Sequence, residues 1–153
     1  MPVSECEFQL NSILDDLEPE PWHVPSDERN SRCTGTALNL AISLLEAVPK
    51  MGARIMSLLG GPCTIGPGTV VGVKLKEFIR AHHDIINATN NCKYMANAKK
   101  YYDGLTQRCM TNNITVDFFA FTLDQFGLVE MQTLPKQTGG YIIFHELFDS
   151  PMF

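Results

Sequence analysis

The sequence lacks any excess of positive charge and any long apolar run. Its 153 residues hold 12 Lys and Arg against 17 Asp and Glu, which gives a formal net charge of −5. This balance excludes the basic surface of a general nucleic-acid binder and a polybasic membrane patch. No apolar run approaches the roughly 20 residues that span a bilayer. The N-terminus is acidic and has no apolar stretch, so it is not a secretory signal.

Cysteine is also scarce, and its spacing is wide. The five cysteines are an odd number and include no C-x-x-C pair. The odd count argues against a disulfide framework, and the missing pair argues against a structural zinc site. We therefore expect reduced thiols in a cytoplasmic protein. The five are Cys6, Cys33, Cys63, Cys92 and Cys109.

The overall composition is that of a globular protein. Apolar residues make up 44% and charged residues 19%, which is far from a disordered composition. A chain of this length buries roughly 68–70% of its unfolded surface, so it can form a core without disulfides or metals.

The first third of the chain predicts a helix, a loop and a second helix. Apolar residues at steps of 3 and 4 predict an amphipathic helix over Phe8–Leu17. Residues 18–31 contain three prolines and predict an extended surface loop, with Trp22 anchoring it to the body. Thr34–Val48 is apolar nearly all round, which predicts a well-buried helix. We expect Thr34 or Thr36 to cap its start and Pro49 to end it.

The rest of the chain alternates between strand and helix patterns. The segments are a buried strand at Ala53–Leu59, a weaker strand at Thr69–Val73, a helix at Asn91–Met110, a strand at Ile114–Leu123, a short helix at Gln125–Met131 capped by Asp124, and a strand at Tyr141–Phe144. This alternation predicts an α/β fold with a parallel sheet covered by helices. Three strands make a small sheet with two exposed edges, which indicates part of a larger fold.

The glycine-rich loop Gly60–Gly68 is the first candidate for chemistry. Gly61–Gly66 has the G-x-x-x-x-G spacing of a phosphate-binding loop, but Pro67 and Gly68 stand where that loop needs Lys and a hydroxyl residue. Pro62 and Pro67 also remove two backbone N–H donors. We interpret the segment as a turn-rich loop that follows a strand. A small α/β enzyme using this loop stays open as an alternative.

Three further sets of residues are candidates for a functional site. His82 and His83 are adjacent, so their side chains diverge and at most one of them can face a metal site. Cys63 with one of these histidines could form a nucleophile–base pair, although the sequence shows neither a lowered pKa nor an oriented partner. Asp117 lies in an apolar strand and needs a polar partner there or an interaction with another protein.

Several ordered segments together resemble one family. They are P-W-H-V-P-S-D (Pro21–Asp27), R-C-T-G-T-A-L-N-L-A-I-S-L-L-E (Arg32–Glu46), G-A-R-I-M-S-L-L-G-G-P-C-T-I-G-P-G-T-V-V-G (Gly52–Gly72), H-H-D-I (His82–Ile85), C-K-Y-M-A-N-A-K-K-Y-Y (Cys92–Tyr102), L-D-Q-F-G-L-V-E-M (Leu123–Met131) and T-G-G-Y (Thr138–Tyr141). Over nearly its whole length the chain resembles the trunk of the Sec-twenty-three subunit of the inner COPII coat.

The resemblance implies a fold and a set of partners. The trunk of that family resembles a von Willebrand factor A domain, which agrees with the alternating pattern. The family subunit pairs with a cargo-binding coat subunit and stimulates GTP hydrolysis by the coat's small GTPase. It acts on COPII-coated vesicles at the cytosolic face of the endoplasmic reticulum, in transport to the Golgi. We therefore expect a protein-interaction scaffold that is peripheral to the membrane through the assembled coat and binds no nucleic acid.

Two departures from the A-domain pattern concern a metal site. Metal-binding A domains have a ligating Thr where this chain has Arg32, and an Asp at the end of the next strand where it has Gly60. An oxygen-ligand site would lose two contributors, and a cation beside Arg32 would be repelled. We expect no metal, cofactor or catalytic residue in this chain. A metal-dependent A-domain ligand binder stays open as an alternative.

The resemblance also implies missing parts. We expect residues 1–153 to be a partial trunk, without the family's zinc finger, its helical domain or its gelsolin-like domain. The family's zinc site then lies outside the chain. The arginine that activates the GTPase belongs to the helical region, as an arginine finger. We therefore expect no enzyme activity, and none of Arg29, Arg32, Arg54, Arg80 and Arg108 to inherit that role.

Overall fold

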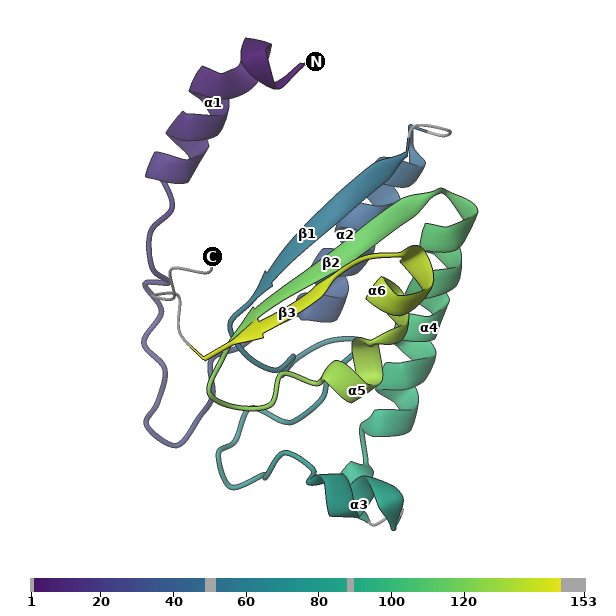
Figure 1. Ribbon diagram of the computed structural model, residues 1–153. Helices are drawn as coiled ribbons and strands as arrows, with labels where there is room; N and C mark the ends of the chain where they lie inside the picture. Colours follow the sequence, from purple (N-terminus) through teal and green to yellow (C-terminus); the bar gives the residue numbers. More distant parts are fainter. Residues whose placement is uncertain (1, 49–51, 88–89, 147–153) are drawn as a thin grey trace.

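A three-stranded sheet forms the centre of the computed structural model, which describes residues 2–48, 52–87 and 90–146. The strands are β1 (Ala53–Leu59), β2 (Ile114–Phe121) and β3 (Ile142–His145), in the spatial order β1-β2-β3. Both strand pairs are parallel, as Figure 1 shows. The predicted α/β class with a parallel sheet is confirmed, and each strand matches a predicted one.

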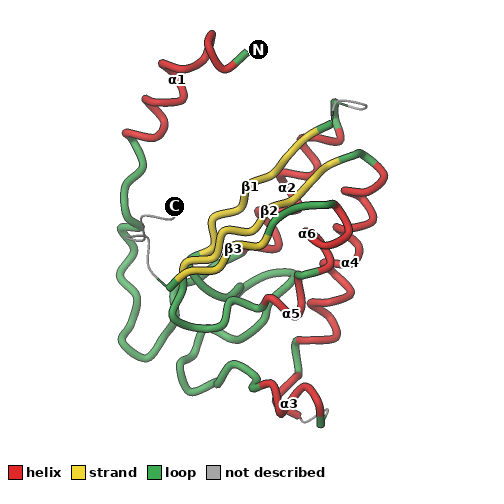
Figure 2. The backbone as a smooth tube through the Cα atoms, in the orientation of Figure 1, coloured by secondary structure: helices red, strands yellow, loops and turns green. Residues whose placement is uncertain are grey.

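The helices connect and cover these strands. They are α1 (Val3–Asp15), α2 (Thr34–Glu46), α3 (His82–Ile86), a 3₁₀ turn at Asn90–Cys92, α4 (Met95–Thr111), α5 (Leu128–Met131) and α6 (Thr133–Thr138). The helices α2, α4 and α6 lie on one face of the sheet (Figures 1 and 2). The connections through α4 and α6 return the chain to the same end of the sheet, as parallel strands require.

The core lies between this face of the sheet and the helices. Alternation along β2 turns every second side chain toward the helices, and these residues are fully buried against α4. The core members from β2 are Ile114, Val116, Phe118 and Ala120, and those from α4 are Ala98, Tyr102, Leu105 and Cys109. The register places Ile55 and Ser57 of β1 beside Val116 and Phe118 on the same face.

The opposite face of the sheet is open in the described part of the chain. Met56 and Leu58 of β1 are 69% and 70% exposed there. The prediction of a buried strand at Ala53–Leu59 is therefore wrong for one of its two faces. The cause is that, among residues 2–48, 52–87 and 90–146, the helices that cover the sheet lie on the other face and β1 pairs only with β2.

The helix α2 is less buried than its composition predicts. Only Gly35, Leu38 and Ile42 are buried, whereas Leu40 and Leu44 are 60% and 65% exposed. Only one stripe of the helix packs on the core, so the prediction of a well-buried helix is wrong.

The predicted ends of α2 differ from the structure as well. Cys33 occupies the N-cap position and no side chain caps the helix, so neither Thr34 nor Thr36 does so. The helix ends at Glu46, and the predicted terminator Pro49 lies outside the described residues.

The N-terminal region contains the predicted helix but not the predicted anchor. No residue of α1 is buried, and the helix stands apart from the sheet (Figure 1). Trp22 is 75% exposed, so its predicted anchoring role is wrong. The loop is held instead at its far end, where Glu28 forms an isolated bridge with Lys74. Arg29 donates to the carbonyl of Lys74 at 2.8 Å.

Two smaller predictions also differ from the structure. Residues 69–73 form a loop rather than a strand, although Val70 and Val71 are buried. Asp124 does not cap the next helix, because α5 begins after Gly127 in the left-handed conformation. The carboxylate of Asp124 instead accepts the N–H of Gln125 at 2.8 Å.

Candidate binding pocket

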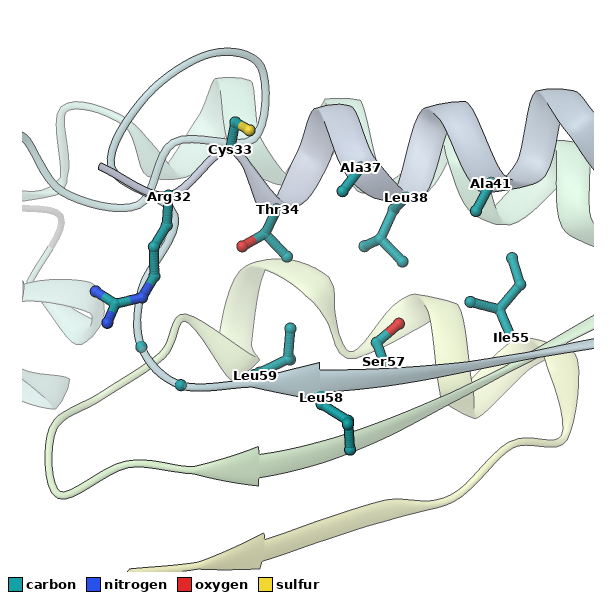
Figure 3. Close-up of a pocket in the computed structure, with 12 residues that line it drawn as sticks. Arg32, Cys33, Thr34, Ala37, Leu38, Ala41, Ile55, Ser57, Leu58 and Leu59 are labelled. Carbon is teal, nitrogen blue, oxygen red and sulfur yellow. The ribbon is translucent and has the colours of Figure 1, made fainter. Parts of the chain in front are cut away.

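A pocket of about 440 Å³ lies between the first half of α2 and the edge of β1. Its walls are mostly apolar. Ala37, Leu38 and Ala41 project from α2 toward the strand, while Ile55 and Leu59 project from β1 toward the helix (Figure 3). The wall from β1 exists because alternate side chains of a strand point to the same face.

One end of this pocket is polar. Arg32 and Thr34 lie at the start of α2, and Gly60 and Gly61 follow β1 directly. The guanidinium of Arg32 lies against Gly61, where an added Cβ would be 3.0 Å from Arg32 Cζ. Arg32 and Gly60, the two residues that depart from the A-domain metal pattern, both line this pocket although they are 28 positions apart.

Arg32 differs from the other arginines in its partners. Within the described residues its guanidinium makes no hydrogen bond or ion pair, and its side chain is only half-buried. Arg29 donates to backbone carbonyls. The other three pair with carboxylates, as Arg54–Asp117, Arg80–Glu130 and Arg108–Glu46. A half-buried cation in an apolar pocket favours a negatively charged ligand there.

The predicted nucleophile is in an environment that suppresses its reactivity. Cys63 is fully buried in the glycine loop, and its S–H donates to the carbonyl of Ile65 at 3.4 Å. Burial raises the pKa of the Cys63 thiol, the opposite of what a nucleophile requires. The loop itself is tied to the core by Tyr102, whose hydroxyl donates to the carbonyl of Gly68 at 3.1 Å.

The histidine pair lies outside this loop, on the short helix α3, which begins 14 positions after Gly68. Both His82 and His83 are exposed, and His83 Nε2 lies 2.8 Å from the side-chain nitrogen of Asn87. Among the described residues, no group of three or more His, Cys, Asp or Glu side chains is gathered closely enough to hold a metal ion.

Asp117 has the polar partners that its place in an apolar strand requires. Its carboxylate accepts from Arg54 Nε at 2.5 Å and from the backbone N–H of Tyr141 at 2.8 Å. The hydrogen bond from Arg54 is the main reason that the pKa of Asp117 lies below its ordinary value. Met56 is the residue of β1 directly beside Asp117 in the register. Arg54 lies two residues earlier on the same face of β1 and therefore reaches Asp117 diagonally.

A second charge pair is buried on both sides, and the sequence pattern does not indicate it. The guanidinium of Arg80 forms an ion pair with the carboxylate of Glu130 and donates to Gln125 Oε1 at 2.8 Å. Both charged side chains are almost fully buried, at 3% and 1% exposure. The pair joins the loop before α3 to α5, and nothing in the local sequence pattern of either residue indicates the other.

The family model of the Sec23/Sec24 trunk domain matches residues 1–152. The chain belongs to this family. A Sec23/Sec24 trunk domain supports a role as a component of the COPII coat. The match agrees with the observed architecture, a parallel sheet flanked by helices as in a von Willebrand factor A-like fold.

The position of the pocket in this Sec23/Sec24 trunk domain bears on what it can bind. It lies at the carboxyl end of β1 and at the start of α2, where open α/β sheets commonly bind ligands.

In the described part of the chain, no helix is long and apolar enough to cross a membrane.

Proposed function

We propose that this chain acts as a protein-interaction scaffold of the COPII coat in transport from the endoplasmic reticulum to the Golgi. The observation that carries the proposal is the family match over residues 1–152. The open sheet face and the exposed stripe of α2 support it further. Apolar surfaces of this kind mark sites of protein association.

The partners that we propose are the cargo-binding coat subunit and the coat's small GTPase. Segments such as Gly52–Gly72 and Cys92–Tyr102 resemble the Sec-twenty-three side of the family. We therefore place the chain on the GTPase-facing subunit rather than on the cargo-binding one. Its location would be the cytosolic face of the endoplasmic reticulum and COPII-coated vesicles, reached through the assembled coat.

We also propose that the chain binds without catalysing and needs no metal. Three of its five arginines are paired with carboxylates, which leaves them poorly placed to enter a GTPase site. The guanidinium of Arg32 beside Gly61 would repel a divalent cation at the A-domain position. Titration calorimetry with Mg²⁺ or Mn²⁺ is expected to give no heat of binding, and stoichiometric micromolar binding would contradict this part of the proposal.

A flotation experiment tests the scaffold proposal. The purified chain is mixed with liposomes, the GTP-loaded coat GTPase and the purified cargo-binding coat subunit. We expect it to float with the liposomes only when these proteins are present. Flotation on bare liposomes, or no flotation in any mixture, would contradict the proposal.

Measurements of GTP hydrolysis test the proposal that the chain binds without catalysing. We expect the chain alone to leave the GTP hydrolysis rate of the coat GTPase unchanged, because the arginine of the family belongs to another region. A saturable acceleration by the wild-type chain that an Arg32→Gln variant loses would show that an arginine of this chain acts as the finger.

A further inference from the structure

Two cysteines meet where the glycine-rich loop packs on the start of α2. The carbonyl of Arg32 accepts the N–H of Thr64 at 2.9 Å, and the N–H of Arg32 donates to Thr64 Oγ1 at 2.8 Å. These hydrogen bonds hold the two segments side by side. Cys33 follows Arg32 directly and Cys63 precedes Thr64, so the two cysteines are neighbours across this contact.

The sulfur of Cys63 lies at the first turn of α2. Burial raises the pKa of Cys63, and hydrogen bonds from the backbone N–H groups of Gly35 and Thr34 partly oppose that rise. A side chain at the N-cap commonly reaches the second of these helical N–H groups, here that of Gly35. Cys33 occupies the N-cap, but within the described residues its side chain makes no capping hydrogen bond. Rotation of Cys33 about its Cα–Cβ bond toward the helix therefore brings its sulfur to that of Cys63.

The two thiols differ in their access to solvent. Cys33 is exposed and Cys63 is fully buried. In Figure 3 the side chains of Cys33 and Thr34 point to opposite sides of the helix start. A dissolved oxidant therefore meets Cys33 first, while burial protects Cys63 from direct attack. An exposed cysteine beside a second cysteine that can react with its oxidised form is the arrangement found in redox-sensing proteins.

We propose that Cys33 and Cys63 form an oxidation site that hydrogen peroxide converts to a disulfide. The sulfur of Cys33 first attacks the peroxide. An S–O bond forms and the O–O bond breaks. The thiol proton leaves with the departing oxygen as water, and Cys33 becomes a sulfenic acid.

The second step uses the buried thiol. Cys63 gives up its proton, and its sulfur attacks the oxidised sulfur of Cys33. The S–S bond forms and the S–O bond breaks, and the departing hydroxide takes up that proton as a second water. In total the two thiols lose two hydrogen atoms, and one peroxide is reduced to two waters.

The disulfide would fasten the glycine-rich loop to α2. In the reduced chain the loop is held by hydrogen bonds, among them that of the Tyr102 hydroxyl to the carbonyl of Gly68 at 3.1 Å. The bond would close residues 33–63 into a covalent loop and so restrict the unfolded chain. It would also fix the polar end of the pocket, where Arg32 and Gly61 lie. This inference does not depend on a role of the chain in the COPII coat.

Peptide mapping of the purified chain tests the pairing. Trypsin cleaves after Lys and Arg, which places the five cysteines on five different peptides. The chain is treated with hydrogen peroxide, its remaining thiols are blocked, and it is digested without reductant. We expect the peptide of residues 33–50 linked to that of residues 55–74, and separation of the two by dithiothreitol.

The yield of this link has an expected size. At about 10 µM protein it should exceed intermolecular disulfides about a hundredfold, because a partner within one chain has an effective concentration in the millimolar range. Any other pairing as the main product would overturn the proposal. Oxidation of Cys33 without a link to Cys63 would overturn it as well.

Single substitutions assign the order of the two steps. Cys33→Ser keeps a side chain that suits an N-cap, and we expect no link and no oxidation of Cys63 at the same peroxide dose. In Cys63→Ala we expect a sulfenic acid to persist on Cys33, where dimedone traps it. The control Cys92→Ser removes a cysteine outside the pair and should form the link at wild-type yield. Oxidation of Cys63 in Cys33→Ser at the wild-type rate would overturn the assigned order.

Thermal denaturation tests whether the folded chain accommodates the bond. We expect the oxidised chain to melt at least about 5 °C above the reduced chain. Cys33→Ser should show no such shift after the same treatment. An unchanged or lower melting temperature of the linked chain would mean that the bond forces the loop away from α2, which would overturn the proposal.

Discussion

Arg80 and Glu130 are buried together at the junction of a loop with α5. Taking two charges out of water is costly, and their mutual attraction with further hydrogen bonds offsets that cost. Gln125 supplies one such bond to Arg80. The pair therefore holds two elements in one arrangement, and its loss should affect stability more than a surface pair would.

Removal of one member of this pair is the first prediction. Glu130→Gln leaves the charge of Arg80 buried without compensation, and we expect a loss of about 3–5 kcal/mol in the free energy of unfolding. The matched control is Glu28→Gln, which removes the carboxylate from an exposed pair with Lys74 and should cost at most about 1 kcal/mol. Urea denaturation measures both, and equal losses would contradict the assigned role of the pair.

The lowered pKa of Asp117 gives the second prediction, on pH dependence. A carboxylate whose pKa is lower in the folded state stabilises the fold above its unfolded pKa, about 3.9. This stability is lost as the pH falls through the folded value. We therefore expect wild type to lose more stability than Asp117→Asn between pH about 5 and pH about 2. Parallel pH profiles for the two proteins would show that the pairing with Arg54 does not contribute.

At the scale of elements, two helical glycines occupy opposite environments. Gly35 of α2 lies against the backbone of Pro67, and an added Cβ would clash with the carbonyl of that residue. Its own carbonyl accepts the hydroxyl of Tyr101 at 3.1 Å. Gly104 lies in the middle of α4, with no atom within 4 Å of an added Cβ. Gly35 permits the close approach of the Pro67 loop to α2, whereas Gly104 makes no such contact and only lowers the stability of α4.

Alanine at these two positions is the third prediction. Gly104→Ala should stabilise the chain by roughly 0.5–1 kcal/mol, because Gly is the less favourable residue inside a helix. Gly35→Ala should destabilise it, because the Pro67 loop must move away from α2. Thermal denaturation gives both results. A stabilised Gly35→Ala variant would mean that the packing of this loop on α2 does not hold in solution.

The sequence predicts the type of each main element better than its burial. The apolar, β-branched run of Ile114–Leu123 marks β2 correctly, since such residues suit a pleated buried surface. Ala53–Leu59 has a similar pattern but occupies an edge, and local composition does not encode which neighbours a strand has. For the same reason α2 is apolar all round and yet half-exposed. The exposed side chains of Leu40, Leu44 and Met56 lie outside the candidate pocket.

The site was predictable in part. Arg32 and Gly60 stand out in the sequence because they depart from a known metal-binding pattern, and the structure brings them together at one end of the pocket. The ion pairs Arg80–Glu130 and Arg54–Asp117 were not predictable as pairs. Their members are 50 and 63 positions apart, and only the tertiary fold brings them into contact.

At the scale of the whole molecule, charge is distributed very unevenly. Residues 1–28 hold eight acidic residues and no Lys or Arg, a formal charge of −8, while the remainder carries +3. This acidic region includes α1, whose large apolar side chains are all exposed, among them Phe8 at 86%. The helix therefore contributes charge and apolar surface but no core packing.

Deletion of the α1 region is the fourth prediction. Removal of residues 2–17 should change the free energy of unfolding by no more than about 0.5 kcal/mol, as for surface changes that break no buried contact. The control is Ile42→Ala in the buried stripe of α2, which should cost about 2–5 kcal/mol. A large loss of stability in the deletion variant would mean that α1 packs on the body in solution.

We propose that the chain binds other coat proteins as a trunk scaffold of its family. Sedimentation velocity of the purified chain with the purified cargo-binding subunit of the COPII coat tests this binding. We expect a single faster-sedimenting species that contains both proteins in equal amounts. Two separate boundaries with unchanged sedimentation coefficients, over concentrations at which both proteins are folded, would contradict it.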